Sequence, residues 1–464
     1  MKKALSLLLA LTSLLCLASC TATAPATTTI ANTTAVTEAP APETVTDKLN
    51  AMAGQLTSLE AIEEAKSLAW EEYVESVKTP IKLRNGKTLY RKDEIKKDAT
   101  TNITIGTTTM KVMTKVIGPM PEGGYPLFLV YHGGGYDPSG QTNESQWKGM
   151  AGRYAHIPGI YCSIRSVSDN ESSGQIFSTD ISWQFYDRII ENCIVFMKAN
   201  PNQVYVVGYS AGGNGVYQIA PRIPDRLAAA TMTAGHPENI DLTNLFNLPF
   251  YLQVGELDSA YSRNTITVEY AQKLDKLAKQ KGGYIHECFV HAGKEHGLVG
   301  DNASGQTVIA DLPAWLTAQK NGTAYTGGTK TAETHAAKLM TAHTRNPIPN
   351  RVIWNVNTTA KSNEMRDLNT FYWLATDATG GMIDASYDKA TNTITIKSCT
   401  IRGGKLTVYL NEDMVDLFKP VTIKLPNGTE RSFTPEISVD VIRETTAERG
   451  DKNYQFCAAY TFSA

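Results

Sequence analysis

Short apolar runs alternate with amphipathic stretches over the middle of the chain, from about residue 102 to residue 320. The runs have the length of buried strands, and the stretches between them repeat apolar residues every three or four positions, as helices do. This alternation is typical of a mostly parallel sheet that helices cover on both faces. We predict strands at 110–117, 126–131, 160–167, 203–209, 228–233, 249–254 and 285–291, and helices near 183–198, 211–220, 266–281 and 313–320.

The flanking segments have different patterns. Residues 47–101 begin with helical periodicity, for which Ser58 is a candidate N-cap. Residues 321–350 are polar and rich in Gly, Thr and Ala, which predicts a linker after the central domain of residues 102–320. Residues 351–464 contain runs at 382–387, 391–396, 406–410 and 421–425 that predict a small antiparallel β domain.

The N-terminus has the pattern of an export signal. Lys2 and Lys3 precede an apolar run of about 15 residues, which is too short to cross a bilayer. The run ends in Leu17-Ala18-Ser19-Cys20, which resembles the lipobox of bacterial lipoproteins. We therefore expect residues 1–19 to be a signal peptide, Cys20 to be lipidated, and the Thr/Ala/Pro-rich residues 20–46 to tether an exported protein to a membrane.

Composition narrows the range of functions. The chain has 464 residues, of which 42% are hydrophobic, enough for a large core. Its 44 Lys and Arg against 46 Asp and Glu give a net charge of −2, which removes the electrostatic basis for nucleic-acid binding. No Cys or His spacing typical of a metal site occurs, so we expect neither a metal nor an organic cofactor.

A serine motif carries the candidate chemistry. Gly208-Tyr209-Ser210-Ala211-Gly212 follows a predicted strand and opens a predicted helix, which is the setting that gives the GxSxG pattern its meaning. Such a turn lifts the serine hydroxyl off the sheet. Ser210 is therefore the candidate nucleophile, and the backbone N–H of Ala211 is a candidate donor to an oxyanion.

A glycine-rich loop follows an earlier strand. His132-Gly133-Gly134-Gly135 leaves backbone amides uncovered by side chains, so Gly134 and Gly135 are candidates for the rest of the oxyanion hole.

Serine needs a base, and the base needs an acid to orient it. His296 lies in a loop just after the strand at 285–291 and is the candidate base, with His291 as the alternative. The candidate acids, Glu256 and Asp258, follow the strand at 249–254.

These motifs make residues 102–320 resemble the α/β-hydrolase superfamily, in particular secreted bacterial serine esterases of the poly(3-hydroxybutyrate) depolymerase and feruloyl esterase type. The resemblance implies the α/β-hydrolase fold and favours Asp258 as the acid, because a G-x-x-D spacing occurs at this strand end in such enzymes. Polyester depolymerases usually carry a Cys-containing oxyanion loop, which this chain lacks.

Several other residues are candidates for contact with the substrate. His132 and His236 follow strands at the expected functional edge of the sheet. Tyr261 and Arg263 follow Asp258 and could bind a carboxylate or a sugar hydroxyl, although a structural ion pair is an equal alternative for Arg263. Trp183 begins a predicted helix, where helical spacing favours a core position over a place in the substrate pocket.

We therefore predict a serine hydrolase that cleaves carboxylic esters, whose partner is an ester substrate that is either small or linked to a polysaccharide. Membrane contact would come only through the N-terminal lipid. One alternative is a peptidase of the prolyl-oligopeptidase type, and another is a non-catalytic surface-binding lipoprotein on the same fold.

Overall fold

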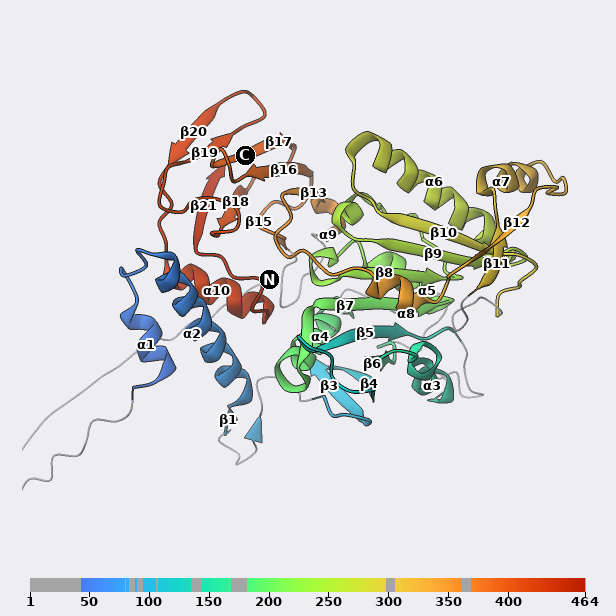
Figure 1. Cartoon of the computed structure of the whole chain (residues 1–464), viewed down its shortest axis with the longest axis horizontal. Coiled ribbons are helices and arrows are strands. Elements are labelled where there is room, and N and C mark those ends of the chain that lie inside the picture. The colour runs from blue at the N-terminus through green and yellow to red at the C-terminus, as the bar shows by residue number, and fades with distance from the viewer. Residues whose placement is uncertain are drawn as a thin grey trace, which may run out of the picture. The chain divides into compact units, whose positions relative to one another are not determined.

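The computed structural model describes residues 43–79, 81–82, 88–89, 95–105, 107–134, 144–167, 182–297, 305–359 and 369–463 (Figure 1). Residues from Thr44 onward belong to one unit. The predicted signal peptide, Cys20 and nearly all of the predicted tether lie outside the described residues.

A ten-stranded sheet forms the centre of this unit. Its strand order is β12-β11-β10-β9-β8-β7-β5-β6-β4-β3, and the neighbours from β10 to β6 are parallel. The strands are β3 (Thr100–Ile105), β4 (Thr108–Ile117), β5 (Tyr125–Tyr131), β6 (Gly159–Ile164), β7 (Ala199–Tyr209), β8 (Ala229–Thr233), β9 (Phe250–Gly255), β10 (His286–His291), β11 (Gln306–Ile309) and β12 (Thr329–Ala332). The carboxyl ends of the parallel strands therefore meet at one edge, where ligands bind in open α/β sheets.

Helices cover both faces of the sheet, because alternate residues of its central strands point to opposite sides. In β5, Leu127 and Leu129 join one buried cluster, whereas Phe128 and Val130 join another. The chain's helices are α1 (Val45–Ala51), α2 (Leu59–Lys78), α3 (Glu144–Tyr154), α4 (Ser182–Met197), α5 (Ala211–Ile219), α6 (Arg263–Lys281), α7 (Leu312–Lys320), α8 (Ala336–Thr341), α9 (Val356–Thr359) and α10 (Val439–Arg449). The arrangement is the α/β-hydrolase fold that the sequence predicts.

The prediction of a linker at residues 321–350 is wrong. This segment contains β12, which pairs with β11 at the edge of the large sheet, and α8, which packs on β7 and β8. Ala336, Ala337 and Met340 of α8 are fully buried with Phe128 and Val130. The segment is part of the catalytic fold because it closes one face of the sheet.

The C-terminal part consists of two small sheets that share one core. One sheet has the order β13-β16-β17-β19-β20 and the other β14-β15-β18-β21. Among the described strands of this part, β17 and β19 pair in parallel and the other pairs are antiparallel, as predicted. The strands are β13 (Arg351–Asn355), β14 (Thr370–Phe371), β15 (Leu374–Thr376), β16 (Met382–Asp388), β17 (Thr393–Cys399), β18 (Lys405–Leu410), β19 (Val421–Lys424), β20 (Glu430–Phe433) and β21 (Ala458–Ser463).

The N-terminal helices belong to this same C-terminal core. Ser58 caps α2 as predicted, accepting a hydrogen bond from the backbone N–H of Ala61 at 3.2 Å. Helix α2 packs along α10 (Figure 1). Its buried Ile62 and Ala65 belong to the hydrophobic cluster that the two small sheets share. Upstream of β3, the pair β1 (Ile81–Lys82) and β2 (Thr88–Leu89) is antiparallel. Residues 44–78 therefore stabilise the C-terminal part although they precede the hydrolase domain in sequence.

Buried ion pairs join the hydrolase domain to the C-terminal part. Asp225, in the short helix η2 (Pro224–Arg226), accepts a hydrogen bond from Arg449 of α10 at 2.5 Å. The same Asp225 carboxylate accepts from the backbone N–H of Tyr372 at 3.2 Å. Nearby, Asp451 pairs with Arg345 at 2.5 Å. These side chains are almost inaccessible to water, so each charge depends on its partner.

The Arg449–Asp225 pair leads to a stability prediction. Arg449→Met leaves the Asp225 carboxylate buried without its guanidinium partner, which should lower the free energy of unfolding by about 3–5 kcal/mol. Chemical denaturation measures the change. Arg443→Met is the matched control, because Arg443 pairs with Glu72 at 2.8 Å on a more exposed surface and should cost about 1 kcal/mol or less. Equal losses in the two variants would contradict this account.

Candidate active site

Ser210 occupies a strained turn between β7 and α5. Its backbone has φ 57° and ψ −117°, a conformation that non-glycine residues rarely adopt. The turn is fixed from both sides: the Ser210 N–H donates to the Thr233 carbonyl at 2.9 Å, and the Asn214 N–H donates to the Ser210 carbonyl at 3.0 Å. The strain is therefore held by the neighbouring strand and by the first turn of the helix.

Glycines make this turn possible, because backbone from other segments occupies the space that a side chain would need. A Cβ on Gly208 would lie 2.2 Å from the carbonyl oxygen of Gly212. A Cβ on Gly212 would lie 2.4 Å from the carbonyl oxygen of Tyr131 and 2.7 Å from that of His132. The second contact places the His132-Gly133-Gly134 segment directly beside the serine turn.

Ser210, His296 and Asp258 form one hydrogen-bonded chain. His296 Nε2 lies 2.9 Å from Ser210 Oγ, and His296 Nδ1 lies 2.8 Å from Asp258 Oδ2. Because a carboxylate only accepts, we assign the Nδ1 proton to the bond with Asp258, which leaves Nε2 free to accept from the serine hydroxyl. The Asp258 side chain is fully buried, whereas 36% of the His296 side chain is exposed. The structure thus joins the predicted base to both its predicted partners.

Two loops at the ends of β9 and β10 hold the acid and the base together. The Leu257 N–H donates to the Lys294 carbonyl at 2.8 Å. A Cβ on Gly255 would lie only 2.4 Å from the same carbonyl oxygen, so only a glycine allows the loops to approach this closely. The separation of Asp258 and His296 is therefore set by backbone packing rather than by the side chains alone.

Tyr209 is a supporting residue that the sequence analysis missed. Its hydroxyl donates to the carbonyl of His296 at 2.9 Å, and the two rings lie 5.3 Å apart. Tyr209 directly precedes the nucleophile, so its ring ties the histidine loop to the serine turn. The variable position in GxSxG gives no sequence signal for such a contact.

Glu256, the alternative acid, has a different role. One carboxylate oxygen accepts from the Gly293 N–H at 2.8 Å and the other from the Trp315 indole N–H at 3.3 Å. Glu256 therefore fixes the start of the histidine loop and anchors it to α7, and the hydrogen bond to His296 comes from Asp258 instead.

His291, the alternative base, is a core residue. Its side chain is fully buried and its Nε2 lies 3.0 Å from the Gln253 side-chain oxygen. Burial, with a smaller contribution from the charge of Lys294, lowers the pKa of His291 to about 4. It is neutral near pH 7, and its Nε2 is engaged away from Ser210.

The predicted oxyanion donors are described only in part. Ala211 is the first residue of α5, where an N–H has no acceptor within its own helix. The carbonyl of Gly134 accepts from the Gln146 side chain of α3 at 2.6 Å, which ties Gly134 to that helix. Gly135 lies outside the described residues.

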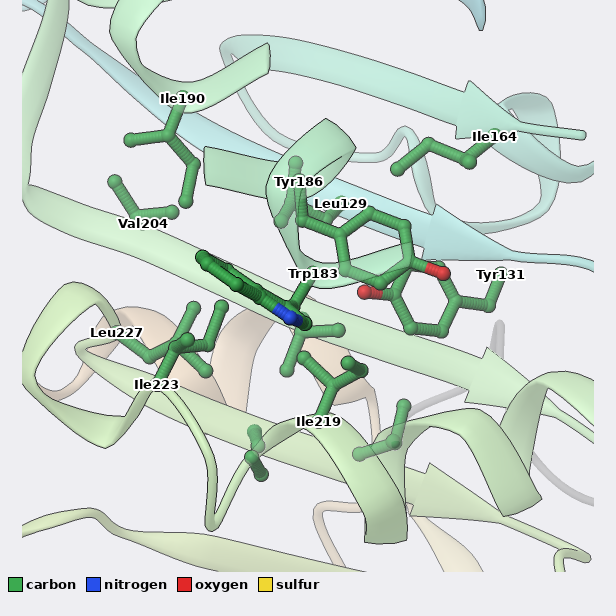
Figure 2. Packing of buried hydrophobic residues seen from close by; sticks show 14 of the residues in the cluster. Leu129, Tyr131, Ile164, Trp183, Tyr186, Ile190, Val204, Ile219, Ile223 and Leu227 are labelled. Carbon is green, nitrogen blue, oxygen red and sulfur yellow. The ribbon is translucent and has the colours of Figure 1, made fainter. Parts of the chain in front are cut away.

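Two of the candidate substrate contacts have buried side chains: Trp183 takes the core position that its spacing favours, and the prediction that His132 contacts substrate is wrong. Figure 2 shows the Trp183 indole packed among apolar side chains, with Leu129 and Tyr186 on one side and Ile219 and Ile223 on the other. His132 is 1% exposed, and its Nε2 accepts from the Ser166 N–H at 3.2 Å while its Nδ1 lies 2.7 Å from the Gly133 carbonyl. Trp183 is core, and His132 orders the glycine loop.

The remaining candidates differ in exposure. His236 is partly exposed, and its backbone N–H donates to the Asn214 side chain at 2.6 Å, just past the serine turn. Tyr261 is 77% exposed and Leu257, next to the acid, is 55% exposed. Arg263 is largely covered and lies 3.9 Å from Asp258 Oδ1, which favours the ion-pair alternative.

Part of the chain, including the three residues of this hydrogen-bonded chain, is similar to a known hydrolase family. The sequence pattern of the dienelactone hydrolase family matches residues 132–321, which include Ser210, Asp258 and His296. The match supports a hydrolase that acts on esters. No curated protein matches the chain.

Solved structures that match part of this chain include several esterases. A thermostable esterase is 17% identical with a TM-score of 0.35, over 47% of this chain and 62% of its own, so the chain spans less than two thirds of that protein. An arylesterase is 13% identical with a TM-score of 0.34, over 56% and 93%. Esterase 2 of Thermogutta terrifontis is 13% identical with a TM-score of 0.33, over 43% and 85%.

Burial of His291 predicts a pH dependence of stability. The unfolded chain binds a proton to His291 below its ordinary pKa of 6.5, whereas the folded protein does so only near 4. The unfolded state therefore binds more protons in this window, and the free energy of unfolding should fall as the pH drops from about 6.5 to about 4, by at most about 3 kcal/mol from this group. Denaturant titrations at several pH values across this range measure the free energy of unfolding. Its fall with decreasing pH should be less steep in His291→Gln than in the wild type. The same pH dependence in the variant and the wild type would contradict the lowered pKa of His291.

Proposed function

We propose that the protein is a serine esterase in which Ser210 is the nucleophile, His296 the general base and Asp258 the residue that orients the base. The observation that carries the proposal is the continuous hydrogen-bonded chain from Ser210 Oγ through both ring nitrogens of His296 to Asp258 Oδ2. Its serine lies on a strained turn at the carboxyl edge of the sheet, which is the arrangement needed to present a hydroxyl to a substrate.

The geometry supports a two-step reaction. Ser210 Oγ attacks the ester carbonyl carbon while its proton passes to His296 Nε2, and the Asp258 carboxylate stabilises the imidazolium that results. The negative oxygen of the tetrahedral intermediate faces the backbone N–H groups of Ala211 and Gly134, where one donor is worth about 3–4 kcal/mol. The C–O bond then breaks and His296 returns the proton to the leaving alcohol.

Water completes the reaction. With the alcohol gone, a water molecule gives a proton to His296 Nε2 and attacks the acyl carbon of the Ser210 ester. Collapse of the second tetrahedral intermediate breaks the bond to Ser210 Oγ, which recovers its proton from His296. The acid is released and the starting hydrogen bonds are restored.

The substrate class that we propose is an acyl group carried on a polysaccharide, as in enzymes of the feruloyl esterase type. Tyr261 and Leu257 support contact with a large substrate, because both are exposed apolar side chains in the turn that carries Asp258. Partly exposed His236 could contribute from the neighbouring strand end. An acyl group attached to a polymer would extend beyond the catalytic residues onto such a rim.

We also propose that the enzyme is exported and anchored by a lipid on Cys20. The support comes from the sequence alone: two lysines, an apolar run and the lipobox-like Leu17-Ala18-Ser19-Cys20. Among the described residues, no helix has the length and apolar character needed to cross a bilayer.

An assay of ester and amide cleavage tests the activity. The wild type should hydrolyse p-nitrophenyl butyrate, and Ser210→Ala should lower kcat by roughly 10³-fold or more, because the nucleophile is lost. Ser432→Ala is the matched control: this exposed serine lies on β20 of the C-terminal part and should leave kcat unchanged.

Two results would contradict the proposal. Cleavage of a peptide p-nitroanilide without ester cleavage would indicate a peptidase instead. Undiminished ester cleavage by Ser210→Ala would show that another group is the nucleophile. Acetylated xylan and methyl ferulate, assayed beside the butyrate ester, then test the substrate class.

A further inference from the structure

Arg263 lies against the side of Asp258 that faces away from His296. It is the first residue of α6, its side chain is only 12% exposed, and its Nη1 lies 3.9 Å from Asp258 Oδ1. The guanidinium carbon lies 4.7 Å from the centre of the Tyr261 ring, and Nη1 also donates to the Ala260 carbonyl at 3.3 Å. The arginine is thus held in place from two directions.

The two oxygens of Asp258 have very different surroundings. Oδ2 accepts the hydrogen bond from His296. Oδ1 is buried and has no hydrogen-bond partner among the described residues. Burying a carboxylate oxygen without a hydrogen-bond donor destabilises the fold. Among the described residues, the positive charge of Arg263 is the main group that offsets this cost.

The position of Arg263 is not one that helix stability favours. The N-terminus of a helix carries a partial positive charge, so a cation in the first turn of α6 is unfavourable there. The turn before it is strained as well, because Tyr261 and Ser262 are consecutive non-glycine residues with φ of 54° and 56°. Unfavourable local geometry that the surrounding structure maintains is typical of functional sites.

Arg263 also has little access to a ligand. The Tyr261 ring stacks on its guanidinium and is itself the exposed group, so a substrate at this rim would meet Tyr261 first.

We propose that Arg263 is a positioning residue that acts on the reaction through Asp258. Its positive charge, 3.9 Å from Oδ1, keeps that oxygen turned toward α6, which directs Oδ2 at His296 Nδ1. This inference rests on the proposed function. Removing the guanidinium would let the carboxylate rotate, and His296 would lose its fixed orientation toward Ser210.

The test compares variants of the full chain with p-nitrophenyl butyrate as substrate. Arg263→Met should lower kcat by roughly tenfold or more with KM within about twofold, because misorientation of a catalytic group affects the chemical step rather than binding. Arg263→Lys, which keeps the charge, should recover most of the loss. Lys273→Met is the matched control, since Lys273 lies on the same helix with its ammonium over the Tyr270 ring at 3.7 Å and should leave kcat unchanged.

A double-mutant cycle separates positioning from a general structural effect. In an Asp258→Asn background there is no carboxylate for Arg263 to hold, so Arg263→Met should cause less than a twofold further loss. A loss in that background as large as in the wild type would show a structural role and overturn the proposal. So would an unchanged kcat in Arg263→Met, or a rise in KM alone.

These outcomes are distinct from failure of the proposed function. An esterase that depends on Ser210 but not on Arg263 would refute only the positioning role. An esterase that does not depend on Ser210 would refute the proposed nucleophile itself.

Discussion

The close approach of backbone segments at the carboxyl edge of the large sheet is the constraint on which the site depends. Gly212 lies against the carbonyls of Tyr131 and His132, and Gly255 lies against that of Lys294. The contact of Gly212 places the glycine-rich loop beside the turn that carries Ser210. The contact of Gly255 places the loop that carries His296 beside the turn that carries Asp258. Side-chain hydrogen bonds of 2.8 and 2.9 Å then join three loops whose backbones are already in place.

The C-terminal part extends this framework rather than forming a separate module. Its core is completed by helices α1 and α2 from the other end of the chain, and buried ion pairs bind it to the hydrolase domain through Asp225 and Asp451. Asn355 of β13 adds a polar contact, since its backbone N–H donates to the Asn244 side-chain oxygen at 2.6 Å. The two parts therefore stabilise each other through buried, paired polar side chains.

Sequence patterns predict the central strands, Ser210 and His296 from local signals: buried apolar runs, GxSxG, and a polar loop directly after a strand. Local position leaves Glu256 and Asp258 open as the acid, and only the resemblance to known esterases favours Asp258. Strand β12 and helix α8 escaped prediction because an edge strand reading Thr-Lys-Thr-Ala and a six-residue helix have almost no periodicity. The burial of His132 is not visible in the sequence, because a motif does not show which side chains other segments cover. The contacts of Tyr209 and Arg263 arise only from tertiary packing.

Trapping the acyl-enzyme tests the central claim most directly. Rapid acid quenching during turnover of p-nitrophenyl butyrate, followed by mass spectrometry of the peptides, should find a butyryl group on the peptide that contains Ser210. The adduct should be absent from Ser210→Ala. An acyl group on another residue, or a quenched enzyme of unmodified mass during a demonstrated burst of p-nitrophenol, would contradict the account.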